Sequence, residues 1–144
     1  MEKRIVYINP DYSIDVIVPA PNSNLDDLIK SQVPEGASYR ILEASSLPQR
    51  DYYRPSWKVD NDFKVIYDMD KAKELHKNLI RKLREPKLEA LDLKYQRADE
   101  EGDLELKKAI VLKKKKLRDL TNHPSIDAAK TIEELKLAAL SELE

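Results

Sequence analysis

The sequence contains no cysteine and only two histidines among its 144 residues. The absence of cysteine excludes disulfide bonds and metal sites built on thiolates. The histidines, His76 and His123, are too few for a histidine-based zinc site unless carboxylates complete it. The acidic cluster between Asp99 and Asp103 lacks the ligand spacing of a calcium-binding loop. We therefore expect neither a metal nor any other cofactor.

Long apolar runs are also lacking. The apolar run nearest the N-terminus, Ile5–Ile8, is only four residues long. A secretory signal needs an apolar stretch of about 7–15 residues, and a membrane-spanning helix needs about 20. We expect no membrane contact and a protein that stays in the cytosol in which it is made.

Glycine is scarce, with two residues in the whole chain. The sequence has no glycine-rich phosphate loop, no Gly-x-Ser-x-Gly motif and no His-Glu-x-x-His motif. Nothing in the sequence pairs either histidine with a nucleophile. We identify no catalytic residue and expect a non-enzymatic protein.

Charged residues are abundant, at 37% of the chain against a usual value of about 25%. The net charge is only −1, so no global field attracts nucleic acid. One run, Lys107–Arg118, has seven basic residues and no acid. It could contact phosphates, or it could be a solvated helix face that complements the negative end of the helix dipole. We favour the second interpretation, so nucleic acid is not the expected partner.

The patterning predicts an α+β fold with two parts. Residues 1–67 read as a small antiparallel β-rich module with one short helix, which Asn24 caps. Turn chemistry at Asn9–Asp11 joins the first two strands into a hairpin. Strands are expected at Arg4–Asn9, Ser13–Pro19, Ser38–Leu42 and Phe63–Tyr67.

Residues 68–144 read as an antiparallel helical hairpin with arms Met69–Glu100 and Asp103–Leu120. Gly102 can adopt the left-handed conformation that ends the first arm. Pro86 should produce a kink or a short break near Arg84–Pro86, since a proline inside a helix costs about 3 kcal/mol. The apolar faces are expected to comprise Leu75, Leu79, Leu83, Leu88, Leu91, Tyr95 and Ala98 on the first arm and Leu106, Ile110, Leu117 and Leu120 on the second.

The end of the chain should form one closing helix. Residues Thr121–Pro124 read as a stop after the hairpin. Thr131 and Glu134 fit a capping box. The helix should then run from Ile132 towards Leu143.

Two groups of residues are candidates for binding a partner. Tyr, Trp and Arg are the residue types that anchor interfaces, and one loop carries Tyr52, Tyr53, Arg54 and Trp57. These side chains could instead seal the sheet against the hairpin, and for Trp57 we favour that core role. The second group, Leu93, Val111 and Leu112, lies off the apolar faces of the hairpin and suggests self-association or a partner. We expect a homo-oligomer.

Short motifs along most of the chain resemble those of small tail-associated proteins of bacteriophages, similar to tail assembly chaperones and tail fibre assembly proteins. They are Val18-Pro19-Ala20-Pro21, Leu47-Pro48 followed by Arg54 and Trp57, Leu88-x-x-Leu91-Asp92, Ala98-x-x-x-Gly102-Asp103, Lys116-Leu117-Arg118-Asp119 and Thr131-x-Glu133-Glu134-Leu135. The loop departs from the family pattern at Arg50-Asp51 and Pro55, so the family's loop contacts are not carried over.

The resemblance implies a role in binding a tail or tail-fibre protein during virion assembly, in the host cytoplasm. One alternative is a structural subunit retained in the virion tail. A second alternative is a nucleic-acid-binding accessory protein that uses Lys107–Arg118.

Overall fold

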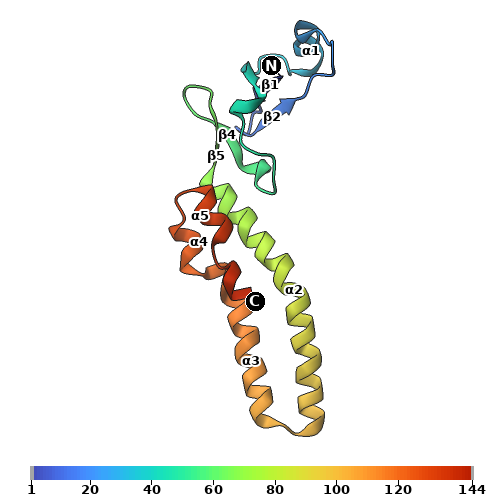
Figure 1. Ribbon diagram of the computed structural model, residues 1–144, viewed down its shortest axis with the longest axis vertical. Coiled ribbons are helices and arrows are strands. Elements are labelled where there is room, and N and C mark those ends of the chain that lie inside the picture. The colour runs from blue at the N-terminus through green and yellow to red at the C-terminus, as the bar shows by residue number, and fades with distance from the viewer. Residues whose placement is uncertain (1, 144) are drawn as a thin grey trace. The chain divides into compact units, whose positions relative to one another are not determined.

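The structure is a computed structural model that describes residues 2–143. Its internal contacts divide the chain into two compact units, Met1–Asp68 and Met69–Glu144, and each is described here by itself. Antiparallel strands precede a series of helices (Figure 1), which confirms the predicted α+β class.

The first unit contains a three-stranded antiparallel sheet in the order β2-β1-β3 and a separate antiparallel pair, β4-β5. We expected a single small sheet and did not predict β4. The elements of this unit are β1 Lys3–Ile8, β2 Ile14–Ile17, α1 Leu25–Gln32, β3 Tyr39–Glu43, the 3₁₀ helices η1 Ala44–Ser46 and η2 Arg54–Ser56, β4 Trp57–Val59 and β5 Val65–Tyr67.

The core of the first unit joins its two sheets. Val6 of β1 and Ile14 of β2 are buried with Trp57 of β4 and Val65 of β5. Flanking side chains close the cluster, namely Ile8, Val16, Leu42, Leu47, Val59, Phe63 and Tyr67. A pair of three-residue strands is too small to be stable alone, so β4-β5 depends on this shared burial.

The second unit contains the predicted hairpin, formed by α2 (Met69–Glu101) and α3 (Leu104–Arg118) (Figure 1). Gly102 at the elbow has φ +67°. The Asp103 N–H donates to the Ala98 carbonyl at 2.9 Å, and the Gly102 N–H donates to the Asp99 carbonyl at 3.1 Å. These two bonds are the Schellman ending of a helix. The Asp103 carboxylate then accepts the Leu106 N–H at 3.1 Å and starts α3.

Pro86 was expected to produce either a kink or a short break near Arg84–Pro86. The break is absent, because α2 continues through Pro86 without interruption. The Arg84 guanidinium donates to the carbonyls of Leu117 and Arg118, at 3.2 and 2.8 Å. It thereby satisfies the end of α3 and ties α2 to it beside the proline. Tertiary contact of this kind offsets a local helix defect.

The buried faces of the hairpin differ partly from the predicted apolar faces. The buried residues of α2 are Ala72, His76, Ile80 and Ala98. Leu83 is 45% exposed and Leu106 is 44% exposed, so neither belongs to the core. In α3, Ile110 and Leu117 are buried as expected.

The chain ends in several short helices, so the prediction of one closing helix was wrong. They are η3 Asp119–Asn122, α4 Pro124–Ala128, α5 Ile132–Leu137 and η4 Leu140–Leu143. The helical segment that follows the hairpin ends at Asn122, within the expected stop. A new helix also begins there, because the His123 side chain caps α4 and Pro124 occupies its first turn. Thr131 caps α5 through the Glu134 N–H at 3.2 Å, as the capping box predicted.

The second unit buries its short helices against α2. The buried side chains include Ile126, Ile132, Leu135 and Leu143. Nε2 of the fully buried His76 lies 2.8 Å from the Ala138 carbonyl, and Lys73 Nζ donates to the Asp127 carbonyl at 3.0 Å. No helix within residues 2–143 combines the length and apolar character that a bilayer crossing requires.

Candidate binding surfaces

The structure separates the four aromatic-loop residues by burial. Tyr53 and Trp57 are each only 4% exposed, whereas Tyr52 is 36% exposed. The rings of Tyr52 and Tyr53 meet edge to face at a centroid distance of 5.7 Å. Burial, followed by the nearby Asp51 and Tyr52, raises the pKa of Tyr53 to about 12. Tyr53 and Trp57 therefore support the loop from inside. Trp57 is a core residue, and its buried neighbours are Val6, Ile14 and Val65 of the first unit.

Short-range hydrogen bonds hold the loop in the shape that positions Arg54. The Asp51 carboxylate accepts the Tyr53 N–H at 2.9 Å. The Ser56 hydroxyl donates to the Tyr53 carbonyl at 2.6 Å. The Arg54 guanidinium consequently lies over the Trp57 ring, 4.7 Å from its centroid. Stacking of this kind suits the planar, delocalised charge of arginine.

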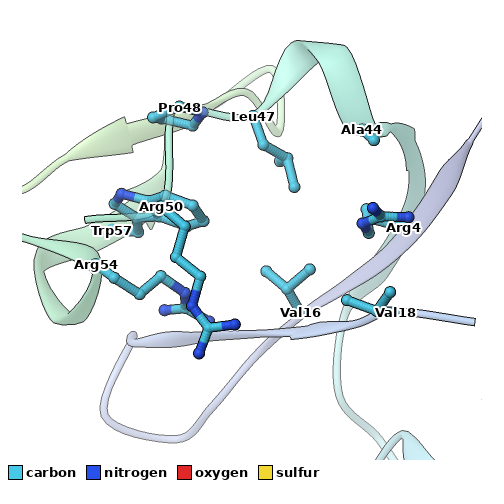
Figure 2. A pocket seen from close by; sticks show the side chains of 9 residues that line it. All are labelled: Arg4, Val16, Val18, Ala44, Leu47, Pro48, Arg50, Arg54 and Trp57. Atoms are coloured by element: carbon cyan, nitrogen blue, oxygen red, sulfur yellow. The ribbon is translucent and has the colours of Figure 1, made fainter.

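Arg54 and Trp57 line a pocket of about 330 Å³ together with residues from distant parts of the first unit. Arg4 comes from β1, Val16 from β2, and Leu47 from the loop after η1 (Figure 2). We refer to this site as the arginine pocket. Its full lining is Arg4, Val16, Val18, Ala44, Leu47, Pro48, Arg50, Arg54 and Trp57.

The arginine pocket combines apolar walls with three guanidinium groups. Arg4 pairs with Glu2 at 3.0 Å. Burial lowers the pKa of Arg54, Asp15 acts in the opposite sense, and neighbouring Arg50 lowers it further. Among the residues that the structure describes, Arg50 has no hydrogen bond or ion pair. The pocket therefore presents cationic donors that the surrounding protein does not fully use.

Sequence reasoning missed most of this pocket. Arg4 and Val16 lie on segments that were expected to be strands, and Arg50 was noted only where the loop departs from the family pattern. The pocket forms because β4 folds back against β2. No local sequence signal marks that long-range contact.

The hairpin residues selected from the sequence lie at its surface. Val111 and Leu112 are 52% and 68% exposed, and Leu93 is 50% exposed. Val111 and Leu112 line a shallow groove of about 480 Å³ with Tyr95 and Leu104. Lys107 and Lys108 border the same groove, whereas Leu93 is not among its lining residues. We refer to this site as the hairpin groove.

Ion pairs occupy much of the basic run Lys107–Arg118. Lys107 pairs with Asp99 at 2.6 Å, Lys116 pairs with Glu142 at 2.9 Å, and Lys114 pairs with Asp92. The hydrogen bond to Asp99 is the main reason that the pKa of Lys107 is raised. These carboxylates compete with any phosphate for the same ammonium groups, which agrees with the solvated-face interpretation of the run.

Both histidines have structural contacts. His76 is fully buried against the Ala138 carbonyl. His123 Nδ1 lies 2.7 Å from the Ser125 hydroxyl, but it also accepts the Ser125 backbone N–H at 3.2 Å, which makes it the cap of α4. The nearby Glu142 carboxylate is engaged by Lys116. The backbone contact makes His123 the N-cap of α4.

Within residues 2–143, no group of three or more histidine or acidic side chains could hold a metal ion. The acids at the elbow have other contacts, because Asp99 pairs with Lys107 and Asp103 caps α3. No protein-family model, no curated protein and no solved structure matches the chain.

Proposed function

We propose that this chain is a non-enzymatic bacteriophage tail protein that binds tail or tail-fibre components during virion assembly in the host cytoplasm. The phage assignment rests on the resemblance of its sequence motifs. The observation that supports a binding role is the hairpin groove, where α3 turns Val111 and Leu112 outward beside Tyr95 and Leu104. Apolar side chains grouped on a surface in this way are typical of a protein-binding site.

The hairpin is suited to present such a groove. The Schellman ending at Gly102 and the Asp103 cap define the elbow. Ion pairs between the arms join Lys107 to Asp99 and Lys114 to Asp92. A surface carried on packed helices is already ordered, so binding costs little conformational entropy.

Self-association through the groove can be tested with two matched variants. We expect light scattering to give the protein a mass above the 16.7 kDa of one chain. Leu112→Glu should lower that mass, because the introduced carboxylate would be buried in the interface. Leu137→Glu is the control, since Leu137 is 78% exposed and lies outside the groove. A wild-type protein that is monomeric at high micromolar concentration would contradict the oligomer.

A structural subunit retained in the virion tail is the closest alternative. Mass spectrometry can distinguish an assembly factor from a structural subunit. It is applied to purified particles of the phage that encodes this chain, with the lysate as control. Abundance in the lysate and absence from particles supports an assembly factor. A fixed ratio to a tail protein in intact particles supports the structural subunit and contradicts the transient role.

A nucleic-acid-binding accessory role is less favoured, because three lysines of the basic run already pair with Asp92, Asp99 and Glu142. A gel-shift titration with duplex DNA and RNA tests it. Binding below micromolar protein at moderate salt, weakened steeply by added salt, would support this role over the first two.

A further inference from the structure

The arginine pocket brings like charges together. Arg50 and Arg54 are close enough for Arg50 to lower the pKa of Arg54. Figure 2 shows their guanidinium groups on the same side of the pocket, with Arg4 on the opposite side. Clustered cations repel one another, so an anion that enters between them relieves this repulsion.

The net charge of the pocket indicates how much negative charge that anion should carry. Glu2 pairs with Arg4, and Asp15 stabilises the charge of Arg54. Three guanidinium groups less two carboxylates leave one positive charge, which belongs formally to Arg50. One excess charge matches a single carboxylate. A nucleic-acid backbone would instead bring several phosphates close to the carboxylates of Glu2 and Asp15.

The geometry of the donors suits a carboxylate. A guanidinium offers five N–H donors in a planar fork that fits the two oxygens of a carboxylate. Arg54 uses one of its N–H groups on the Ile14 carbonyl, at 3.5 Å. The remaining donors of Arg54 and all those of Arg50 stay available for a ligand.

The rest of the pocket is apolar. Val16, Val18 and Leu47 line it together with the Trp57 ring, and Val18 lies on the side of Arg4 (Figure 2). A volume of about 330 Å³ holds one or two amino-acid side chains. An aliphatic side chain that enters with the carboxylate would be removed from water against these walls.

We propose that the arginine pocket binds a peptide segment of a partner protein in which a carboxylate is followed or preceded by an aliphatic side chain. Arg50 and Arg54 hold the carboxylate, and Val16, Val18 and Leu47 hold the aliphatic side chain. The hairpin groove belongs to the other unit, so this site is separate from it. The pocket would bind the same ligand whether or not the protein belongs to a phage tail.

The probe for the test is a blocked pentapeptide, Gly-Leu-Asp-Leu-Gly, titrated into the full chain. Trp57 is the only tryptophan, so its indole N–H gives a single resonance that reports on the pocket. One bidentate ion pair with a buried leucine should give a dissociation constant of about 1 mM or tighter. The peptide with asparagine in place of the aspartate should bind about tenfold more weakly, because it lacks the charge.

Variants of exposed arginines separate the pocket from a general charge effect. Arg50→Gln should weaken peptide binding about tenfold, or about 1.4 kcal/mol. It should not unfold the protein, because within residues 2–143 Arg50 has no hydrogen bond or ion pair to lose. Arg50→Lys keeps the charge but loses the planar fork, so its effect should be intermediate. Arg40→Gln is the control in the same unit, since Arg40 is exposed and lies outside the pocket.

Three results would overturn the proposal. The first is no saturable shift of the indole resonance up to about 10 mM peptide, which is far above the expected constant. The second is equal binding of the aspartate and asparagine peptides, or no effect of Arg50→Gln. The third is tighter binding of inorganic phosphate than of the aspartate peptide, which would assign the pocket to a phosphate ligand.

Discussion

Substituting alanine for Gly102 tests whether the elbow of the hairpin depends on the backbone freedom of one residue. Gly102 has φ +67°, and among residues 2–143, its two chain neighbours aside, no atom lies within 4 Å of the position that a Cβ would occupy. A clash with the surroundings is therefore excluded as a cause of destabilisation. Any loss must come from the left-handed backbone conformation itself.

The expected size of the loss follows from two opposing effects. A non-glycine residue in the left-handed conformation costs about 1–2 kcal/mol. Alanine also restricts the unfolded chain, which returns about 0.4–1 kcal/mol. The free energy of unfolding of Gly102→Ala should fall by about 1 kcal/mol, which lowers the urea midpoint by about 0.5 M.

The assay is urea unfolding followed by far-ultraviolet circular dichroism, because the second unit is mainly helical. Gly102→Asn should lose less than Gly102→Ala, since asparagine tolerates the left-handed conformation better. Gly36→Ala is a matched control, with φ +82° and equally open surroundings in the first unit. A Gly102→Ala protein as stable as the wild type, or an asparagine variant less stable than the alanine variant, would refute the reasoning.

Three further predictions concern single side chains. Pro86→Ala should raise the free energy of unfolding by up to about 3 kcal/mol, since it restores a helical N–H inside the uninterrupted α2; thermal unfolding measures this gain. His76→Leu should lower it by about 1–3 kcal/mol, because the buried Ala138 carbonyl loses its ring nitrogen partner; urea unfolding measures that loss. Because folding raises the pKa of Tyr53 to about 12, its neutral phenol stabilises the protein fully below pH 10, and this contribution is lost as the pH rises towards 12. Tyr53→Phe should therefore reduce the fall in the free energy of unfolding at alkaline pH. Tyr12→Phe, at an exposed position, should leave that fall unchanged.

Local chemistry explains why many elements could be predicted from the sequence. Asn24 and Thr131 each accept a backbone N–H at the start of the helix that they were expected to cap. Asp103 does the same at the start of α3. Gly102 ends α2 as expected. These signals act over three or four residues, so a single sequence contains all the information that they need.

Tertiary contacts explain the main errors. Alanine is the strongest helix former, yet Ala139 has φ +62° and lies between α5 and η4. Next to it, the Ala138 carbonyl bonds to His76, a residue far away in the sequence. Pro86 shows the opposite case, in which packing keeps a helix that local propensity would interrupt.

The arginine pocket could not be predicted for a related reason. Its guanidinium groups come from β1, from the loop that leads into η2 and from η2 itself, so they are far apart in the sequence. Of the pocket residues, only Arg54 and Trp57 were predicted from the sequence as candidates for binding a partner. That prediction rested on their residue types, since arginine and tryptophan often anchor interfaces. The convergence of Arg4 with Arg50 depends on how the two sheets share a core.

The nested contacts of the hairpin determine how it can fold. Lys107 and Asp99, next to the elbow, are 8 residues apart, whereas Arg84 and Arg118, at the far end, are 34 apart. Each contact closed outward from the elbow adds only a small further loss of chain entropy. The two helices can therefore zip together from Gly102 on a microsecond timescale. In the first unit, by contrast, β1 pairs with β3, and both β2 and α1 lie between them in the sequence. Their strand register therefore depends on a contact between distant segments of the chain.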